Sequence, residues 1–492
     1  MSPRRRWFVT AGVMTGMLLA ALEGTVVGTA MPTIVAALGG LAHYSWVFSA
    51  YLLTSTVTVP VWGKLSDLFG RRPLFQIGVA VFLIGSAACG LSQTMTQLII
   101  SRAVQGVGAG ALVPLAMTII GDIFTLQERA KMQGFFSGVW GVSSVFGPLL
   151  GGFITDQLSW RWVFLINLPV GIAAAAIIGF GLVEPKREER AAIDYAGAIV
   201  LTGAVTLLLL VLGDGNRYLL LLPVVALFLW FVRIEQRAED PIVPLRLFRN
   251  RVVTVAIVVG FLAGIAMFAG ITFVPLLAQG VLGATATEAG SFLTPLMLAW
   301  VLASIVGGRL LMRLGSRTLV LSGLVFMLVG FAALATFSRT TPRMLMLLEL
   351  TLIGAGLGLT MLTLLIASQH SVPREQLGIT TSLNQFSRSI GGALGVALLG
   401  AVLAAGLAEF AQDPNALVNP EARAHIAPAE LAALQGALQK TLRTIFWACA
   451  AVIAVALAVA SRIPPGRITD AHGERMVHAE MTNIDAAHEP EG

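Results

Sequence analysis

The sequence predicts an all-α polytopic membrane protein. Three observations lead to this fold class: a very apolar composition, long apolar segments in series, and an uneven distribution of basic residues between the loops. Of the 492 residues, 56% are hydrophobic and only 12% are charged, whereas a soluble domain carries about 25% charged residues. The mean hydropathy is +0.84. With so few charges, we expect most of the surface to face lipid rather than water.

Apolar segments recur along almost the whole chain. A membrane-spanning helix needs roughly 20 mainly apolar residues. Fourteen candidate spans follow one another: 7–30, 44–62, 74–92, 97–121, 131–155, 161–183, 194–213, 217–234, 252–278, 288–311, 317–337, 342–369, 376–408 and 441–461. The first follows three arginines at 4–6 and exceeds the ~7–15 apolar residues of a signal peptide, so we expect it to be retained.

The basic residues orient these spans. With the N-terminus in the cytoplasm, 23 of the 32 Lys and Arg residues fall in cytoplasmic segments, seven lie outside, and Arg102 and Arg388 lie within spans. Lys and Arg are enriched in cytoplasmic loops, so both termini are expected in the cytoplasm. The net charge of +6 therefore reflects membrane anchoring, and a nucleic-acid partner is not expected.

The chain repeats itself at an interval of about 245 residues. Residues 63–72 recur as 308–317, and the glycine string 106–110 recurs as 354–358. Internal repeats around a central site are typical of secondary transporters. The expected units are a six-helix bundle at 1–183, two extra central helices with a basic cytoplasmic segment at 184–251, a second, pseudo-symmetric six-helix bundle at 252–462 with an outer loop at 409–440, and a disordered cytoplasmic tail at 463–492.

Five motifs in this order resemble those of the major facilitator superfamily. Residues 63–72 resemble its loop signature G-x-L-x-D-x-x-G-R-R, and 102–108 resemble the fourth-span motif R-x-x-Q-G-x-G. Residues 141–152 resemble the fifth-span antiporter motif, 22–32 the acidic first-span motif of drug:proton antiporters, and 160–169 the sixth-span entrance of the fourteen-span branch. This resemblance implies a multidrug or quaternary-ammonium exporter with the major facilitator fold.

The resemblance also implies roles for particular residues. The loop signature would form a conformational latch between the two halves, from Gly63, Asp67, Gly70, Arg71 and Arg72. The alternative is a solvated loop held by glycine turns. Met312 stands in the second copy where Asp67 stands in the first, so a latch that depends on this acid exists once.

The substrate cavity or its gate is expected to include Thr25, Gln105, Gly147, Pro148 and Arg388. Gly147 and Pro148 would interrupt the fifth span, either as a bend used in gating or as an accommodation to packing, because proline removes a backbone donor. The spacing of Gly106 and Gly110 permits close approach of two helices.

Glu23 is the leading candidate for proton coupling. At ~1.5 Å per residue it lies about 10 Å from the outer edge of the first span, and Arg102 lies at a similar depth in the fourth. An ionisable group within a span is costly and usually pairs or faces water. Glu23 could therefore exchange a proton as access alternates, or it could form a permanent ion pair with Arg102. Many relatives in the resembling family carry Asp at this place.

A second polar site is expected in the C-terminal half. Glu349 occupies the position in the repeat that corresponds to Arg102, and Arg388 lies near the middle of the thirteenth span. They could form a functional polar site or a structural pair. Because both intramembrane acids then have a basic neighbour, the sequence does not specify a cationic substrate.

These observations predict a proton-coupled antiporter for lipophilic or amphipathic molecules, in the bacterial cytoplasmic membrane and associated with antibiotic resistance. An exporter of a lipid or endogenous metabolite is the alternative, and a nutrient importer or uniporter is a more distant one. No Walker A string, zinc-spaced cluster or G-x-S-x-G elbow occurs, so we expect no enzyme, metal or cofactor and take the proton gradient as the energy source. The partners are the substrate, protons and membrane lipids, and the expected unit is a monomer.

Overall fold

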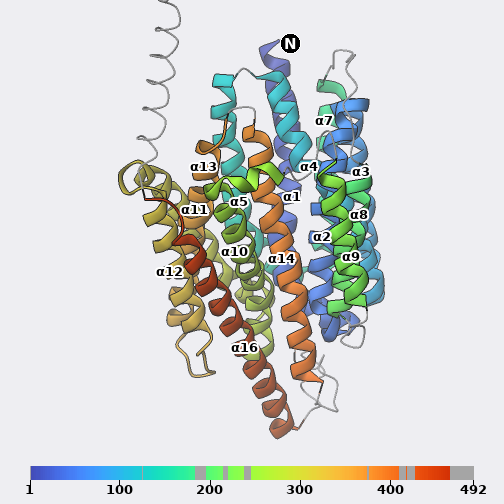
Figure 1. Cartoon of the computed structure of the whole chain (residues 1–492). Coiled ribbons are helices and arrows are strands. Elements are labelled where there is room, and N and C mark those ends of the chain that lie inside the picture. Colours follow the sequence, from blue (N-terminus) through green and yellow to red (C-terminus); the bar gives the residue numbers. More distant parts are fainter. Residues whose placement is uncertain are drawn as a thin grey trace, which may run out of the picture.

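The structure, a computed structural model, describes residues 2–124, 126–182, 195–213, 220–237, 245–373, 376–408, 417 and 427–465. Long helices run side by side along one axis, with the N-terminus at the upper end in Figure 1. We call the end at which the first helix begins the near end, and the opposite end the far end.

The N-terminal half contains seven α-helices: α1 (Pro3–Leu38), α2 (Tyr44–Phe69), α3 (Arg71–Leu91), α4 (Met95–Ile123), α5 (Leu126–Gln157), α6 (Trp162–Leu165) and α7 (Asn167–Gly181). Two helices follow, α8 (Tyr195–Gly213) and α9 (Leu221–Glu235), and then a short 3₁₀ helix, Leu245–Arg249. The C-terminal half contains α10 (Arg251–Leu276), which continues into a π-helical turn at Leu277–Val281, α11 (Ala286–Leu314), α12 (Ser316–Leu334), α13 (Arg343–His370), α14 (Leu377–Leu407) and α16 (Pro428–Ala460).

The chain is a multi-pass membrane protein. Within the described ranges, 11 helices are long and apolar enough to cross a membrane. Helices also form over the second, seventh and eighth predicted spans, as α2, α8 and α9, but they are not among the 11. Hydroxyl-bearing residues lower the hydropathy of α2, and α9 has only 15 residues.

The packing of the helices reproduces the sequence repeat. In the N-terminal half α4 packs on α2 and α3, and α1 packs on α5 and α7; in the C-terminal half α13 packs on α11 and α12, and α10 packs on α14 and α16. Each half therefore forms a helical bundle with the same internal order. The bundles meet mainly where α5 packs on α11 and where α2 packs on α14, while α8 and α9 pack together with α8 against α2 and α14.

Glycines make this packing possible at matched places in the two bundles. A Cβ atom on Gly106 of α4 would lie 2.6 Å from the Tyr51 carbonyl oxygen of α2. In the second copy, a Cβ atom on Gly354 of α13 would lie 2.0 Å from the Leu296 carbonyl oxygen of α11. Neither space admits a side chain, so the repeated glycines set the close approach of these helices, as their spacing predicts.

Several local expectations need correction. The fifth span is not interrupted, because α5 continues through Pro148, whereas the sixth is broken at Ile166 between α6 and α7. Gly63 does not form a turn, because it lies inside α2. The two cysteines, Cys89 and Cys449, are buried and free, and a buried free cysteine packs as a small apolar group.

Parts of the terminal and loop predictions fall outside the described residues. Of the outer loop at 409–440, the structure describes Leu417 and the stretch from residue 427 onward, where 428–440 belong to the single long helix α16. In the basic segment that follows the two central helices, the structure describes the residues up to 237 and those from 245 onward. The tail is described only up to residue 465.

Candidate functional site

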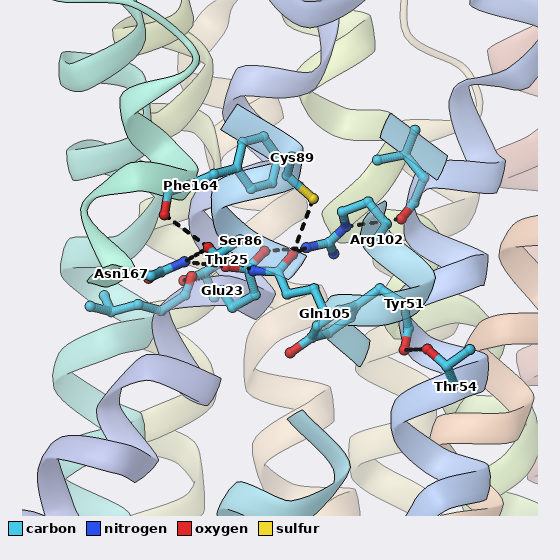
Figure 2. Close-up of polar contacts among 12 residues, drawn as sticks. Glu23, Thr25, Tyr51, Thr54, Ser86, Cys89, Arg102, Gln105, Phe164 and Asn167 are labelled. Carbon is cyan, nitrogen blue, oxygen red and sulfur yellow. Dashed lines mark hydrogen bonds and ion pairs between the residues drawn. The ribbon is translucent and has the colours of Figure 1, made fainter. Parts of the chain in front are cut away.

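A buried ion pair joins the first and fourth helices. Arg102 of α4 donates from Nη1 to Glu23 Oε1 of α1. Both residues are only 2% exposed, and the labelled residues around them come from α1, α2, α3, α4, α6 and α7 (Figure 2). The similar depth of the two residues, inferred from the sequence, is therefore matched by direct contact in the structure.

The guanidinium of Arg102 has further partners. Its Nε donates to the carbonyl oxygen of Val47 at 3.2 Å, and its Nη1 donates to Gln105 Oε1 at 2.7 Å. The guanidinium carbon also lies 4.1 Å from the centre of the Tyr51 ring, in a cation–π contact. A buried charge pair is tolerated only when additional hydrogen bonds compensate for lost hydration, and these contacts supply that compensation.

The second oxygen of Glu23 is held from α7. Asn167 Nδ2 donates to Glu23 Oε2 at 2.8 Å and to Ser86 Oγ at 2.9 Å. Ser86 also accepts from Gln105 Nε2 at 3.1 Å and donates to the Phe164 carbonyl oxygen at 2.9 Å. The network therefore closes on itself, because Gln105 leads back to Arg102.

The break between α6 and α7 places Asn167 in this network. Pro169 lacks the N–H group that would serve the Leu165 carbonyl in a continuous helix, and α6 ends at Leu165. The Phe164 carbonyl next to the break accepts the Ser86 hydroxyl. Asn167 starts α7 and is buried. Arg161, just before α6, donates to the carbonyl oxygens of Gly90 and Ser92 at 2.9 and 2.7 Å and so ties this segment to the end of α3.

The expected gate residues of α5 pack tightly between the two bundles. Thr25 Oγ1 lies 3.3 Å from the Ser143 carbonyl oxygen, to which it donates, and a Cβ atom on Gly147 would lie 2.0 Å from that Thr25 oxygen. On the opposite side, a Cβ atom on Gly290 of α11 would lie 2.2 Å from the Pro148 carbonyl oxygen. Of the two roles considered for Gly147 and Pro148, the uninterrupted α5 favours the packing role.

The far end carries polar contacts between the bundles that the sequence did not indicate. Asp156, near the end of α5, accepts hydrogen bonds from the backbone N–H groups of Ala286 and Thr287 at 3.2 and 2.8 Å, and from Thr287 Oγ1 at 2.5 Å. The first backbone N–H groups of a helix have no partner within it and carry partial positive charge. Asp156 thus caps α11 of the other bundle, and we call these three residues the far-end latch.

A second far-end contact comes from the π-helical turn after α10. Gln279 Nε2 donates to the Thr29 carbonyl oxygen at 2.8 Å, and Thr33 Oγ1 donates to Gln279 Oε1 at 3.3 Å. Tyr44 Oη also donates to the Thr272 carbonyl oxygen at 2.7 Å. Because these bonds join the bundles at the far end, the structure is closed there.

Glu349 and Arg388 do not form the expected polar pair. Glu349 on α13 is buried, and its Oε2 has no hydrogen-bond partner within the described part of the chain. Arg388 on α14 instead donates from Nη2 to Gln385 Oε1 on its own helix. The expectation that both intramembrane acids have a basic neighbour is therefore wrong for Glu349, because the pseudo-symmetric position alone did not bring the two side chains together.

The near-end loop signature contains an ion pair with a residue that the sequence analysis missed. Gly70 has a φ of 95°, a conformation that favours glycine, and ends α2. Arg71 donates from Nη1 to Ser66 Oγ at 2.6 Å and from Nε to Asp122 Oδ2 at 3.2 Å. Arg72 follows Arg71 as the second residue of α3. The side chain of Asp67 lies outside what the structure describes.

Sequence signals for the missed residues were weak. Asn167 stood inside a recognised motif but without a role, and Ser86, Asp122 and Asp156 are isolated polar residues near or within spans. Within the described residues, no group of three or more His, Cys, Asp or Glu side chains is arranged to hold a metal ion.

Comparisons with known proteins agree with this architecture. The family model of the major facilitator superfamily matches residues 13–396. The chain is 42% identical to the multidrug transporter protein MdtP of Bacillus subtilis over 412 residues, 81% of this chain and 75% of that protein. It is 38% identical to multidrug resistance protein 3 of the same organism over 404 residues, 80% of this chain and 79% of that protein.

The fold resembles that of a solved transporter. A bacterial homologue of the human lysosomal transporter Spinster, crystallised in an inward-facing and unoccupied conformation, superposes with a TM-score of 0.69 at 18% identity. The match covers 94% of this chain and 98% of that chain.

Proposed function

Because the chain belongs to the major facilitator superfamily and is a membrane transporter rather than an enzyme, we propose that it is a proton-coupled antiporter that exports lipophilic or amphipathic small molecules. In this proposal the two bundles alternate between an inward-open and an outward-open state. Protons enter from the outside, and cargo leaves from the cytoplasm or the inner leaflet.

The topology that we propose is that of the fourteen-span drug:proton antiporter branch. It is supported by the helices α2, α8 and α9, which form over three predicted spans in addition to the 11 strongly apolar helices. The location that we propose is the bacterial cytoplasmic membrane with both termini in the cytoplasm. The excess of basic residues in the corresponding loops supports that orientation.

One observation carries the proton-coupling proposal: the buried carboxylate of Glu23, which is ion-paired to Arg102 inside the N-terminal bundle. In the far-end-closed state both oxygens of Glu23 accept hydrogen bonds, an arrangement that suits the carboxylate form. When the far end opens, water reaches the pair, a proton binds Glu23, and the guanidinium is released. Closure then carries the neutral acid inward, and it loses its proton to the cytoplasm. Each charge that crosses 100 mV contributes about 2.3 kcal/mol to cargo export.

The other candidate residues have subordinate roles in this proposal. Glu349 is a second proton-binding acid, because a buried carboxyl without a partner is held most cheaply in its neutral form. Thr25, Gln105 and Arg388 contribute to the substrate cavity. Gly147 and Pro148 form a rigid gate contact rather than a bend. The near-end loop, with Gly63, Asp67, Gly70, Arg71 and Arg72, latches the bundles on the cytoplasmic side.

The names of two relatives support a drug-like cargo rather than a lipid or metabolite. These relatives are a multidrug transporter and a multidrug resistance protein of Bacillus subtilis. In the transport assay, the uptake of a lipophilic cationic dye is measured with lipids or neutral drugs as competitors. The class of compound that reduces dye uptake identifies the class of cargo.

The proposal is tested with purified full-length protein in liposomes that carry an imposed pH gradient. We expect dye accumulation in the wild type, its collapse when a protonophore is added, and loss of gradient-driven accumulation in Glu23→Gln. Glu430→Gln is the matched control, because Glu430 is a half-buried residue in the first turn of α16 and is far in sequence from the network. Gradient-driven accumulation by Glu23→Gln at the wild-type rate would overturn the proposal.

A further inference from the structure

The carboxylate of Glu23 is held from two opposite sides. Arg102 donates to Oε1, and Asn167 donates to Oε2 at 2.8 Å. Asn167 is 3% exposed, and no role follows for it from the sequence repeat or from the ion pair itself. We propose that Asn167 is a positioning residue that holds Glu23 in its ionised form in the far-end-closed state and must turn its amide when Glu23 takes a proton. This inference rests on the proposed proton-coupling role of Glu23.

The hydrogen bonds form a closed ring, and Glu23 is the acceptor in both of its bonds within that ring. From Glu23 the ring passes through Asn167, Ser86, Gln105 and Arg102 and returns to Glu23. Figure 2 shows these side chains converging between the helices. A hydrogen bond donated to the charged form of a carboxyl favours that form, so the ring as it stands suits only the carboxylate.

A proton on Glu23 conflicts with the ring. If Oε2 carried the proton, its O–H would face the N–H of Asn167, and two donors would meet. The amide of asparagine has an oxygen acceptor as well as an NH₂ donor, so rotation of Asn167 by half a turn would present Oδ1 to the protonated acid. Ser86 can follow, because its hydroxyl hydrogen can rotate from the Phe164 carbonyl toward that Oδ1.

Few other titratable or charged groups lie around Glu23. Arg102 approaches from α4; Tyr51 of α2 lies against its guanidinium, and Cys89 of α3 donates from Sγ to Gln105 Oε1 in the same network. The described contacts that α5 and α7 make in this region come from Ser143 and Asn167, neither of which titrates. Asn167 can therefore be replaced by a neutral side chain without altering the charge on the site.

Two chemically different substitutions of Asn167 test its contact with Glu23. Leu is close to Asn in size but offers no donor, so the ionised form of Glu23 loses one hydrogen bond. Asp has the shape of Asn but places a second carboxyl beside Oε2, and two adjacent carboxyls share a proton because both cannot easily ionise. We expect the pH at which Glu23 ionises to rise by about one unit in Asn167→Leu, and by more than that in Asn167→Asp.

The test is an infrared titration of the full-length protein in liposomes, which follows the carboxyl C=O band as the pH is raised. The band of Glu23 is assigned by its loss in Glu23→Gln, and that of Glu349 by its loss in Glu349→Gln. Asn384→Leu is the matched control, because Asn384 is an amide of α14 that donates to Ser368 Oγ at 3.0 Å and to the Thr380 carbonyl oxygen at 2.9 Å in the other bundle.

The expected result is a shift of the Glu23 midpoint in Asn167→Leu, a larger one in Asn167→Asp, and none in Asn384→Leu, with the pH profile of dye transport moving in the same order. Unchanged midpoints in both Asn167 variants would overturn the inference, even if Asn167→Leu were less stable to heat. If Glu23→Gln retained gradient-driven transport while the midpoints moved as expected, the proton-coupling proposal would fail and the positioning role of Asn167 would stand. Should Asn167→Leu fail to fold, the isosteric Asn167→Asp decides alone.

Discussion

The far-end latch offers a direct test of how this transporter is held closed. Asp156 accepts three hydrogen bonds from Ala286 and Thr287 across the boundary between the bundles. These bonds can form only while α5 and α11 are in contact. We therefore predict that Asp156→Ala shifts the equilibrium toward the state that is open at the far end.

The size of the shift follows from the exposure of the latch. Asp156 is exposed, so water replaces its bonds when the bundles separate. A net hydrogen bond contributes about 0.5–1.5 kcal/mol, and an exposed charge at a helix N-terminus contributes about 0.3–1 kcal/mol. Because solvent competes for all three bonds, we take about 1–2 kcal/mol for the whole latch, which changes the ratio of the two states by about 5–30-fold.

The equilibrium can be measured by the distance between spin labels at the far end. Leu158 follows α5, and Met344 lies in the first turn of α13 in the other bundle; their side chains are 66% and 78% exposed and accept labels. The native cysteines, Cys89 and Cys449, are buried. We expect Asp156→Ala to enlarge the population with the longer distance in liposomes.

A matched control separates the latch from the stability of α11 itself. Glu288 belongs to the capping box of that helix with Thr285 and makes its bond within the same bundle. Glu288→Ala should weaken the start of α11 without altering the label distances. The reasoning is refuted if Asp156→Ala leaves the distance distribution unchanged, or if Glu288→Ala shifts it to the same extent.

Two further predictions concern the buried acids. Arg102→Met leaves the Glu23 carboxylate buried without its cation, so we expect a loss of about 3–5 kcal/mol of unfolding free energy at alkaline pH. This loss should shrink as the pH falls, because Glu23 then takes a proton and becomes neutral. Adding Glu23→Gln to the Arg102→Met variant should restore its stability at alkaline pH. Thermal unfolding at several pH values checks this, and a pH-independent loss would contradict it. Glu349→Met removes a buried oxygen without a partner, so we expect about 1–3 kcal/mol of stabilisation and fewer protons moved per cargo molecule. A lower unfolding temperature would show that Glu349 has a partner that stabilises it.

The sequence was sufficient for the helical fold and its repeat because both depend on patterns spread over many residues. Apolar runs mark each helix, and the glycines at 106–110 and 354–358 mark the same close contacts in each half. Depth along a helix was also predictable, since Glu23 and Arg102 lie at matching heights and do meet. Height is fixed by the rise per residue, which needs no knowledge of neighbours.

Direction around a helix was much harder to infer than depth. Glu349 and Arg388 were expected to meet, but Arg388 bonds to Gln385 on its own helix, and Oε2 of the buried Glu349 has no partner among the described residues. The position of Asn167 depends on the break at Ile166, and its approach to Glu23 depends on how α7 packs against α1. Such contacts join residues more than 100 positions apart, and one sequence contains no periodic signal for them.

The two halves share a backbone plan but differ in their polar chemistry, and this difference bears on the mechanism. In the N-terminal bundle the buried acid accepts hydrogen bonds from a cation and from an amide. In the C-terminal bundle Glu349 takes the place that Arg102 has in the repeat, and its Oε2 accepts no hydrogen bond from the residues that the structure describes. In the proposed mechanism the two acids therefore offer protons two different surroundings in the same closed conformation. The duplication supplies two lobes that can rock against each other, while the proton gradient, not the difference between the lobes, sets the direction of net transport.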